Sequence, residues 1–298
     1  MNEYRFNFVN KNIITTKLNK FNFVLPSMSR VNIDSNRIHI ELKEPELDAS
    51  NEDLLPLLRK SVSNFRDFQV VLASGGIDSS IIAKLLNEFN SDVQLITCGT
   101  ENSEDLFYAR ILAKSMGKEL IEVKLDEKKV EETIRALRNL KFGTYDILLG
   151  IVEYNALNMA YQLGFRKIVT GAGSDEAFFG YSLYKGMEQK EANRYRLYRV
   201  SRLSDTDLLR MHILADRFGE EIGLPYLDDG VLGFAFRNVH EYDGKSSLRR
   251  IAEEIELPGD LINRGKKAMQ YGSGVTALLE SLSRSKGFNS IPALIKEV

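Results

Sequence analysis

Between about residues 50 and 185, short apolar runs alternate with longer segments in which apolar residues recur at helical spacing. The predicted strands are residues 68–73, 93–98, 119–125 and 166–170. The predicted helices are residues 51–65, 77–89, 104–116, 126–140 and 146–163. Strands separated by helices require crossover connections, so the pattern predicts an α/β fold with a mostly parallel sheet and helices on both faces. Ligands of such sheets lie at the carboxyl ends of the strands.

The chain on either side of this region has a different pattern. Residues 1–44 alternate apolar and polar side chains between Asn-rich breaks, which predicts a few short strands that each bury one face. After about Tyr184 we find no convincing strand, and the spacing predicts helices over residues 188–202, 206–218, 246–256 and 275–285. We therefore divide the chain into three parts: a short β-rich region (1–48), an α/β domain (49–185) and a helical part (186–298).

Composition narrows the function classes. The 298 residues include 40 Lys and Arg against 42 Asp and Glu, so the chain has no overall positive charge for nucleic acid, which we do not expect as a partner. No apolar run approaches the roughly 20 residues that span a bilayer, and the first residues lack a signal-peptide pattern, so we expect a cytoplasmic protein without a membrane partner. The single cysteine, Cys98, excludes an internal disulfide framework and a multi-cysteine metal site.

The sharpest chemical signal is the Ser-Gly-Gly-Ile-Asp-Ser string at residues 74–79, directly after a predicted strand and at the start of a helix. Two adjacent glycines let backbone N–H groups approach an anion, and the helix N-terminus adds positive potential. Asp78 would repel a phosphate directly, so its useful role is to hold Mg²⁺. The alternative is a tight turn that Ser and Asp cap. The string resembles the PP-loop of ATP pyrophosphatases, which cleave ATP between the α- and β-phosphates.

A second string, Gly-Ala-Gly-Ser-Asp-Glu at residues 171–176, follows the fourth predicted strand. Ser174 is the expected helix N-cap, and acids in the first turn of a helix are favourable without any function. In a parallel sheet, however, this turn and the first lie at the same edge. We therefore expect Asp175 to face Asp78 across a nucleotide and to share its magnesium ions.

Together the two strings resemble the synthetase domain of the asparagine synthetases and of their relatives, the β-lactam synthetases. The resemblance covers about residues 50–285. Its further elements are residues 99–106, 145–147, 207–210, 221–228, 245–249, 257–258, 264–266 and 272–274. It implies that a carboxylate attacks the α-phosphorus of ATP to give an acyl-adenylate and pyrophosphate, and that an amine then displaces AMP to form an amide.

The resemblance also implies residue roles. It implies ATP contacts for Leu72, Ser74, Gly75, Gly76, Asp78, Ser79, Cys98, Gly171 and Gly173. It implies that Asp78 and Asp175 bind Mg²⁺ and that Lys266 stabilises negative charge as the catalytic lysine. Glu221 matches an acid near the acceptor site of the family. Without the resemblance, Cys98 is a small core residue, and Lys266 with Lys267 is a solvated charge pair.

The sequence departs from the family pattern where the acceptor is selected. Ala172 stands where asparagine synthetases have the Glu that handles ammonia, Gly223 stands where the family usually has Arg, and Gly265 replaces a Pro. Aspartate and ammonia are therefore expectations from kinship, and an amidoligase with another carboxylate stays open. No glutaminase half is expected, because position 2 is Asn rather than a Cys nucleophile. Glutamine is thus excluded as nitrogen donor unless a separate protein supplies ammonia.

Two other functions compete with amide formation. One is a PP-loop enzyme that adenylates a tRNA base, for which residues 194–202 offer four Arg and two Tyr on one predicted helix. We favour a solvated helix face with its Tyr residues toward the core. The other is a nucleotide-binding protein without catalysis, and the presence of Asp78, Asp175 and Lys266 argues against it.

Overall fold

The computed structural model describes residues 3–8, 29–34, 37–43, 53–140, 142–237 and 244–298. The chain forms two compact units, each built from three separate stretches. The sheet unit comprises residues 65–171, 210–223 and 249–298, and the companion unit comprises residues 1–64, 172–209 and 224–248. The division into three consecutive segments (1–48, 49–185 and 186–298) stays a prediction, and much of the first segment lies outside the described residues.

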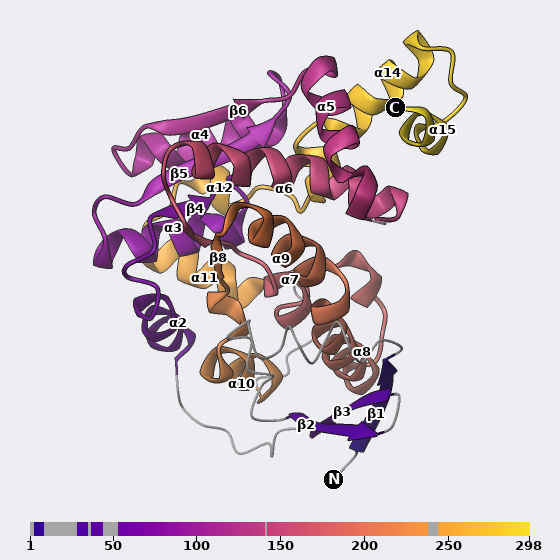
Figure 1. Ribbon diagram of the computed structural model, residues 1–298. Coiled ribbons are helices and arrows are strands. Elements are labelled where there is room, and N and C mark those ends of the chain that lie inside the picture. Colours follow the sequence, from indigo (N-terminus) through magenta and orange to yellow (C-terminus); the bar gives the residue numbers. More distant parts are fainter. Residues whose placement is uncertain (1–2, 9–28, 35–36, 44–52, 141, 238–243) are drawn as a thin grey trace. The chain divides into compact units, whose positions relative to one another are not determined.

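A five-stranded, entirely parallel sheet organises the sheet unit, with strand order β6-β5-β4-β7-β8. Figure 1 labels β6, β5, β4 and β8 of this sheet. The strands are β4 (Val70–Leu72), β5 (Gln94–Gly99), β6 (Leu120–Lys124), β7 (Lys167–Val169) and β8 (Glu221–Gly223). The first four confirm the predicted strands and the parallel sheet. The prediction that no strand follows Tyr184 is wrong: β8 pairs with β7, but three residues are too few to give an alternating pattern.

Helices cover both faces of this sheet. They are α3 (Ile77–Phe89), α4 (Glu104–Ser115), α5 (Glu127–Leu137), α6 (Thr144–Gln162), most of α9 (Asp207–Phe218), most of α11 (Ser246–Glu254), α12 (Gly259–Ile262), α13 (Met269–Gly272), α14 (Val275–Ser285) and α15 (Ile291–Glu297). Right-handed crossovers put α3 and α4 on one face and the α5–α6 connection on the other, because the chain moves outward from β4 to β6 and then returns to β7.

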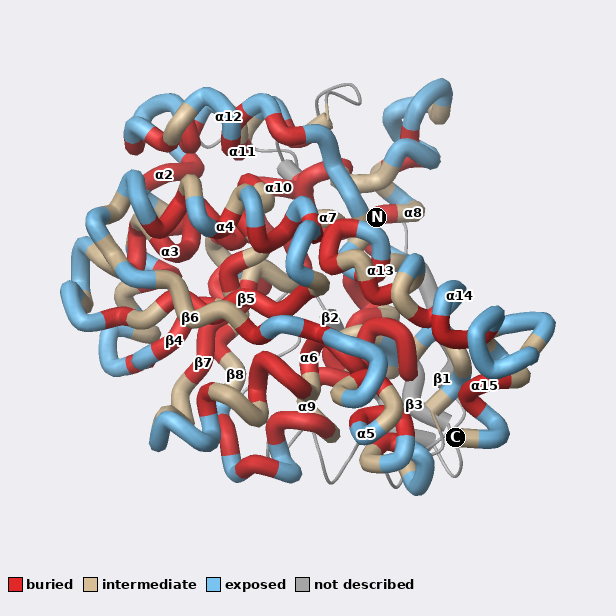
Figure 2. The backbone as a smooth tube through the Cα atoms, turned by 90° about the horizontal axis from the view of Figure 1, so that it is seen from above, coloured by how far each residue is buried: buried red, intermediate tan, exposed pale blue. Residues whose placement is uncertain are grey.

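The core on the α6 face shows why these segments form strands. Val70, Ile96, Val123 and Ile168 come from four neighbouring strands and belong to one buried cluster with side chains of α5, α6, α9, α14 and α15. Figure 2 shows β4, β5 and β7 largely in the colour of buried residues. Strands that are buried on both faces read as continuous apolar runs, which is the pattern in the sequence.

The companion unit contains a small antiparallel sheet and several helices. Its sheet has strand order β1-β3-β2, with β1 (Glu3–Phe8), β2 (Ser29–Asp34) and β3 (Arg37–Lys43), as the alternation in residues 1–44 predicted. Its helices include α2 (Leu54–Ser63), α7 (Ser174–Ala177), α8 (Gln189–Arg202) and α10 (Asp229–Arg237). Helix α10 was not predicted from the sequence.

Helix α8 corrects the prediction of a solvated basic face. Arg196 is fully buried, donates to the carbonyl oxygens of Ala177 and Ala235, and lies over the rings of Phe179 and Phe236. A further arginine of the stretch, Arg199, pairs with Glu176 at 3.5 Å, and Arg202 pairs with Asp205 at 2.9 Å. These guanidinium groups hold the unit together, so the structure gives no support to a nucleic-acid surface here.

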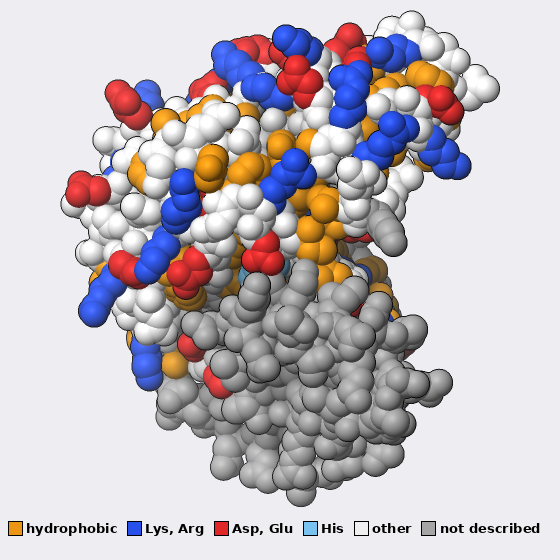
Figure 3. All heavy atoms as spheres, in the orientation of Figure 1, with side chains coloured by type: hydrophobic (Ala, Val, Ile, Leu, Met, Phe, Trp, Pro, Cys, Tyr) orange, Lys and Arg blue, Asp and Glu red, His pale blue; other side chains and the backbone are white. Residues whose placement is uncertain are grey.

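The surface of the described residues is mixed in charge. Figure 3 shows Lys and Arg side chains interspersed with Asp and Glu on the face that it draws, in keeping with the net charge of −2. Within the described ranges, no helix combines the length and apolar character that a bilayer crossing demands.

Candidate active site

The loop between β4 and α3 is pressed against the backbone of α4. Gly75 has φ +70°, a conformation that side chains disfavour, and a Cβ added there would lie 2.5 Å from the backbone N of Ala109. Glycine is therefore required at this position for two reasons, its dihedral angle and the close approach of another helix. The result is a rigid turn directly after the carboxyl end of a central strand.

The first turn of α3 presents backbone N–H groups without a side-chain cap. Its N-cap is Gly76, which provides no side-chain hydrogen bond to the helix start. Ser74 and Ser79 face each other inside the loop instead: Ser74 Oγ accepts from the Gly76 N–H at 3.3 Å, and Ser79 Oγ donates to the Gly76 carbonyl at 3.2 Å. A turn capped by Ser and Asp does not describe this loop; an uncapped helix N-terminus is the arrangement at which proteins commonly bind anions.

Neighbouring strand ends line the same edge of the sheet. A Cβ on Gly171, just after β7, would lie 3.1 Å from Ser79 N and 3.1 Å from Asp78 Cβ. Leu72 ends β4 and is half-buried. Cys98 lies buried in β5, and burial raises the pKa of its thiol, so it remains a neutral core residue.

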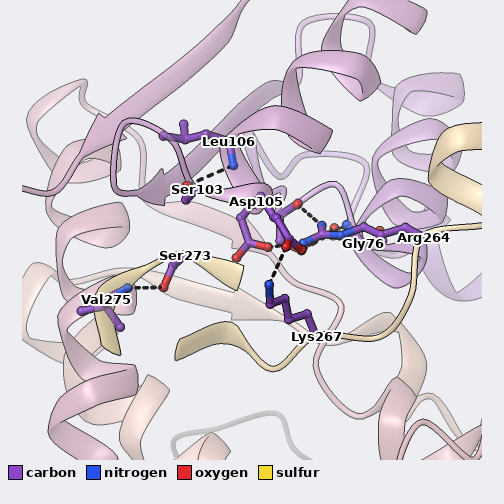
Figure 4. A network of polar contacts seen from close by, with 11 residues as sticks. Gly76, Ser103, Asp105, Leu106, Arg264, Lys267, Ser273 and Val275 are labelled. Atoms are coloured by element: carbon purple, nitrogen blue, oxygen red, sulfur yellow. Dashed lines mark hydrogen bonds and ion pairs between the residues drawn. The ribbon is translucent and has the colours of Figure 1, made fainter. Parts of the chain in front are cut away.

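A segment from the C-terminal part of the chain is tied to this edge (Figure 4). Arg264 Nη1 donates to the Ser74 carbonyl at 2.6 Å and Nη2 donates to Asp105 Oδ1 at 2.5 Å. Burial raises the pKa of Asp105, while Arg264 and, more weakly, Lys266 lower it. Lys266 is exposed two residues after Arg264, and Lys267 pairs with Glu104 at 2.5 Å.

Except for Gly171, the second predicted string belongs to the companion unit. Gly173, at φ +89°, is the N-cap of α7, so the prediction of Ser174 as the cap is wrong. The buried Lys245 lies 2.7 Å from Asp175 Oδ1 and 3.3 Å from Ser174 Oγ. Glu176 is buried beside Arg199, and burial raises the pKa of its carboxyl.

The sheet unit thus brings Leu72, residues 74–79, Cys98, Gly171 and the Arg264–Lys266 segment to one region. Asp175 and Gly173 belong to the companion unit, so a magnesium ion shared by Asp78 and Asp175 stays a prediction. Within the part of the chain that the structure describes, no group of three or more His, Cys, Asp or Glu is arranged to hold a metal ion.

Glu221 lies elsewhere. It is the first residue of β8, opposite Lys167 in the register, and its side chain is 57% exposed at 4.0 Å from Lys167 Nζ. In a parallel sheet the amino ends of the strands lie at the edge opposite the carboxyl ends, so the structure does not bring Glu221 to the loop of residues 74–79.

Buried ion pairs are the functional candidates that the sequence did not reveal. Besides Arg264 and Asp105, Arg210 bonds to Glu153 through two nitrogens, at 2.8 and 3.0 Å, and to Asp146 at 3.0 Å. Asp146 and Arg210 belong to two stretches of the family resemblance that are far apart in sequence. Nothing in the sequence pairs them, because a charged residue ordinarily indicates a solvated position.

The fold and the loop define the class of protein: an α/β protein with a glycine-rich, uncapped helix start at the carboxyl edge of a parallel sheet. The chain matches the asparagine synthase family over residues 53–193 and 185–285. It belongs to this family.

Two similar proteins of known sequence agree with that assignment. The chain is 29% identical over 294 residues to a protein of Methanocaldococcus jannaschii whose name assigns it to the glutamine-hydrolysing asparagine synthetases, covering 83% of this chain and 54% of that protein. It is 32% identical to an asparagine synthetase of Gallus gallus, covering 70% and 40%. The chain therefore spans about half the length of these curated relatives. A solved structure, an NH₃-dependent NAD synthetase from Campylobacter jejuni, is 16% identical with TM-score 0.42, covering 83% and 93%.

Proposed function

We propose that the chain is an ATP-dependent amide-forming ligase that activates a small carboxylate as an acyl-adenylate. The observation that carries the proposal is the meeting of the residue 74–79 loop with the Arg264–Lys266 segment at the carboxyl edge of the sheet. Membership in the asparagine synthase family supports the same chemistry. We further propose that the protein works in the cytoplasm and takes ammonia, if that is its amine, from a separate source.

The loop supplies the phosphate site. Backbone N–H groups of the first turn of α3 and the positive end of that helix would hold the pyrophosphate part of ATP. The Ser74 and Ser79 hydroxyls, which face each other at 3.4 Å, add donors at the same place. Leu72, Cys98 and Gly171, at the ends of β4, β5 and β7, would contact the nucleotide through backbone groups.

The residues present fit a magnesium ion. Mg²⁺ is usually bound by one or two carboxylates together with substrate phosphates and waters, and Asp78 offers a half-exposed carboxylate in the first turn of α3. Asp175 is the second candidate ligand, although Lys245 holds one of its oxygens at 2.7 Å. A bound magnesium ion would neutralise charge on the phosphates of ATP.

The proposed reaction consists of two displacements. A carboxylate oxygen attacks the α-phosphorus, the bond between the α-phosphorus and the bridging oxygen breaks, and pyrophosphate leaves with that oxygen. The amine nitrogen then attacks the acyl carbon, the bond to the AMP oxygen breaks, and the nitrogen loses a proton. Lys266 would stabilise the negative charge that develops on the phosphates in the first displacement.

Acceptor selection differs from that of the family. A Cβ on Gly223 would lie 2.7 Å from Cδ1 of Phe65 and 3.1 Å from Cε1 of Phe68, so the Arg of the family pattern does not fit here without rearrangement. Ala172 cannot take a proton or bind an ammonium group. We keep aspartate as the first candidate carboxylate and propose that another carboxylate or amine is used if aspartate fails.

ATP–pyrophosphate exchange with a panel of carboxylic acids, aspartate first, tests the first displacement. AMP release with ammonia and other amines then tests the second. Lys266→Ala should abolish exchange and leave ATP binding largely intact, whereas Lys267→Ala is the matched control and should resemble the wild type. Exchange that persists in Lys266→Ala would contradict the assignment.

A further inference from the structure

The stretch from Arg264 to Gly272, which we call the Lys266 loop, closes on one buried carboxylate. At its start, Arg264 Nη2 donates to Asp105 Oδ1 at 2.5 Å. At its end, a Cβ added to Gly272 would lie 2.8 Å from Asp105 Cγ. The Asp105 side chain is only 7% exposed, so Arg264 is bonded to, and the Gly272 backbone lies close against, the same buried carboxylate.

Arg264 also joins the Lys266 loop to the residue 74–79 loop. Its Nη1 donates to the Ser74 carbonyl at 2.6 Å, and its guanidinium carbon lies 4.5 Å from the centre of the Tyr108 ring. The planar fork of arginine can bond to a carbonyl and a carboxylate at once, whereas the ammonium of lysine is a point charge. The residue is buried, so water competes little for these bonds.

The backbone around Lys266 has no regular structure of its own. Residues 264–268 lie between α12 and α13 and form neither helix nor strand. The place of Lys266 therefore depends on side-chain contacts of the Lys266 loop, and among those described the bond of Arg264 to Asp105 is buried, whereas the pair of Lys267 with Glu104 is exposed to solvent. Such placement matters because a displacement of about 1 Å in a catalytic arrangement can lower the rate about 100-fold.

We propose that Arg264, bonded to Ser74 and Asp105, is a positioning residue that holds Lys266 beside the phosphate-binding loop. This inference rests on the proposed function, because it explains how the lysine of that site is placed. Arg264 needs no contact with ATP in this role. A displaced lysine removes an interaction made only in the transition state, so the loss falls on kcat rather than on KM for ATP.

Two variants disturb the anchor in different ways. Arg264→Lys keeps the charge and removes the fork, and Gly272→Ala keeps every charge and pushes a methyl group into the Asp105 carboxylate. Each should lower kcat for ATP–pyrophosphate exchange by about 100-fold and change KM for ATP less than about threefold. Gly272→Ala also keeps the test decisive if Arg264→Lys fails to fold.

Each variant has a matched control that leaves the bonds of Arg264 in place. Lys267→Ala breaks a solvent-exposed ion pair to Glu104, the residue next to Asp105. Gly259→Ala, at the start of α12, adds a methyl group whose nearest heavy atom in the described residues is Asn263 Nδ2 at 3.9 Å. Both controls should retain the kcat of the wild type. Wild-type kcat in Arg264→Lys and Gly272→Ala, or equal losses in the controls, would overturn the inference.

Hydrogen–deuterium exchange gives a readout that needs no turnover. Amides of residues 265–271 should exchange at least about tenfold faster in Arg264→Lys and Gly272→Ala than in the wild type. If the wild type shows no ATP–pyrophosphate exchange in the presence of any carboxylate, the proposed function fails. If hydrogen–deuterium exchange of these amides is unchanged in both variants, the positioning role of Arg264 is refuted, whatever the outcome for the proposed function. If Lys266→Ala keeps full turnover while Arg264→Lys loses it, Arg264 does not act through Lys266 and the inference is wrong.

Discussion

Glu220 makes the stability of the sheet unit depend on pH. The residue is only 8% exposed, and within the described residues neither carboxylate oxygen has a hydrogen-bond partner. Burial raises the pKa of its carboxyl from the usual 4.5 to about 8, and the charge of Arg166 offsets only part of that rise. In the folded protein the side chain therefore keeps its proton over a range in which the unfolded chain has lost it.

The sign and size of the effect follow from these two pKa values. Between pH 4.5 and about 8 the folded state binds more protons than the unfolded state, so the free energy of unfolding falls as pH rises. Each pH unit corresponds to about 1.4 kcal/mol, which gives an upper limit of about 5 kcal/mol. We expect a change of about half that free energy, because water and neighbouring groups relax around a buried charge and lower its cost. The stabilisation is fully present below pH 4.5 and lost above about pH 8.

Glu220→Gln removes the titration and preserves the shape of the side chain. Its stability relative to the wild type should grow by about 2–3 kcal/mol between pH 5 and pH 8.5, or about 5–10 °C in Tm. Thermal unfolding followed by circular dichroism at four pH values measures this difference. Glu221→Gln is the matched control, because the carboxylate of Glu221, next to Glu220 in sequence, is 57% exposed. Its removal should change the stability by a small amount at every pH. A Glu220→Gln difference that stays constant with pH would refute the reasoning.

Three further substitutions test the phosphate loop and the acceptor side. Gly75→Ala should destabilise the protein by more than about 2 kcal/mol in chemical unfolding and weaken ATP binding, since its methyl group meets the backbone of α4; wild-type stability would contradict this packing. Asp78→Ala should weaken Mg-dependent ATP binding at least about tenfold by titration calorimetry, and a variant that keeps the affinity of the wild type at high Mg²⁺ would be the contrary result. Ala172→Glu should increase ammonia-dependent AMP release, and no gain would show that this position does not limit the use of ammonia.

Much of the sheet unit could be predicted because its signals are local. Helix α3 matches its predicted range of residues 77–89, since a strand, a glycine turn and an apolar periodicity follow one another without interruption. The approach of Gly171 to Asp78 and Ser79 follows from topology alone, because parallel strands end at the same edge.

Strand β8 and Glu221 show where local signals fail. The motif match gave Glu221 a place near the acceptor, but the residue opens a three-residue strand and lies opposite Lys167. A one-dimensional match carries no information on strand direction, and direction decides which edge of the sheet receives a side chain. The pairing of β8 with β7 comes from contacts across more than 50 residues of sequence, which no window of periodicity covers.

The buried charged residues explain why part of the site could not be predicted from the sequence. Arg196, Arg210 and Arg264 each satisfy a carbonyl or carboxylate that lies 19 to 190 residues away in the sequence. A buried guanidinium is stable only when such partners surround it, and a composition or a helical pattern shows the charge without the partners. In α8 this difference reverses the interpretation, from a basic surface to internal bonds. In the Lys266 loop it gives Arg264 a role that its place in a motif did not indicate.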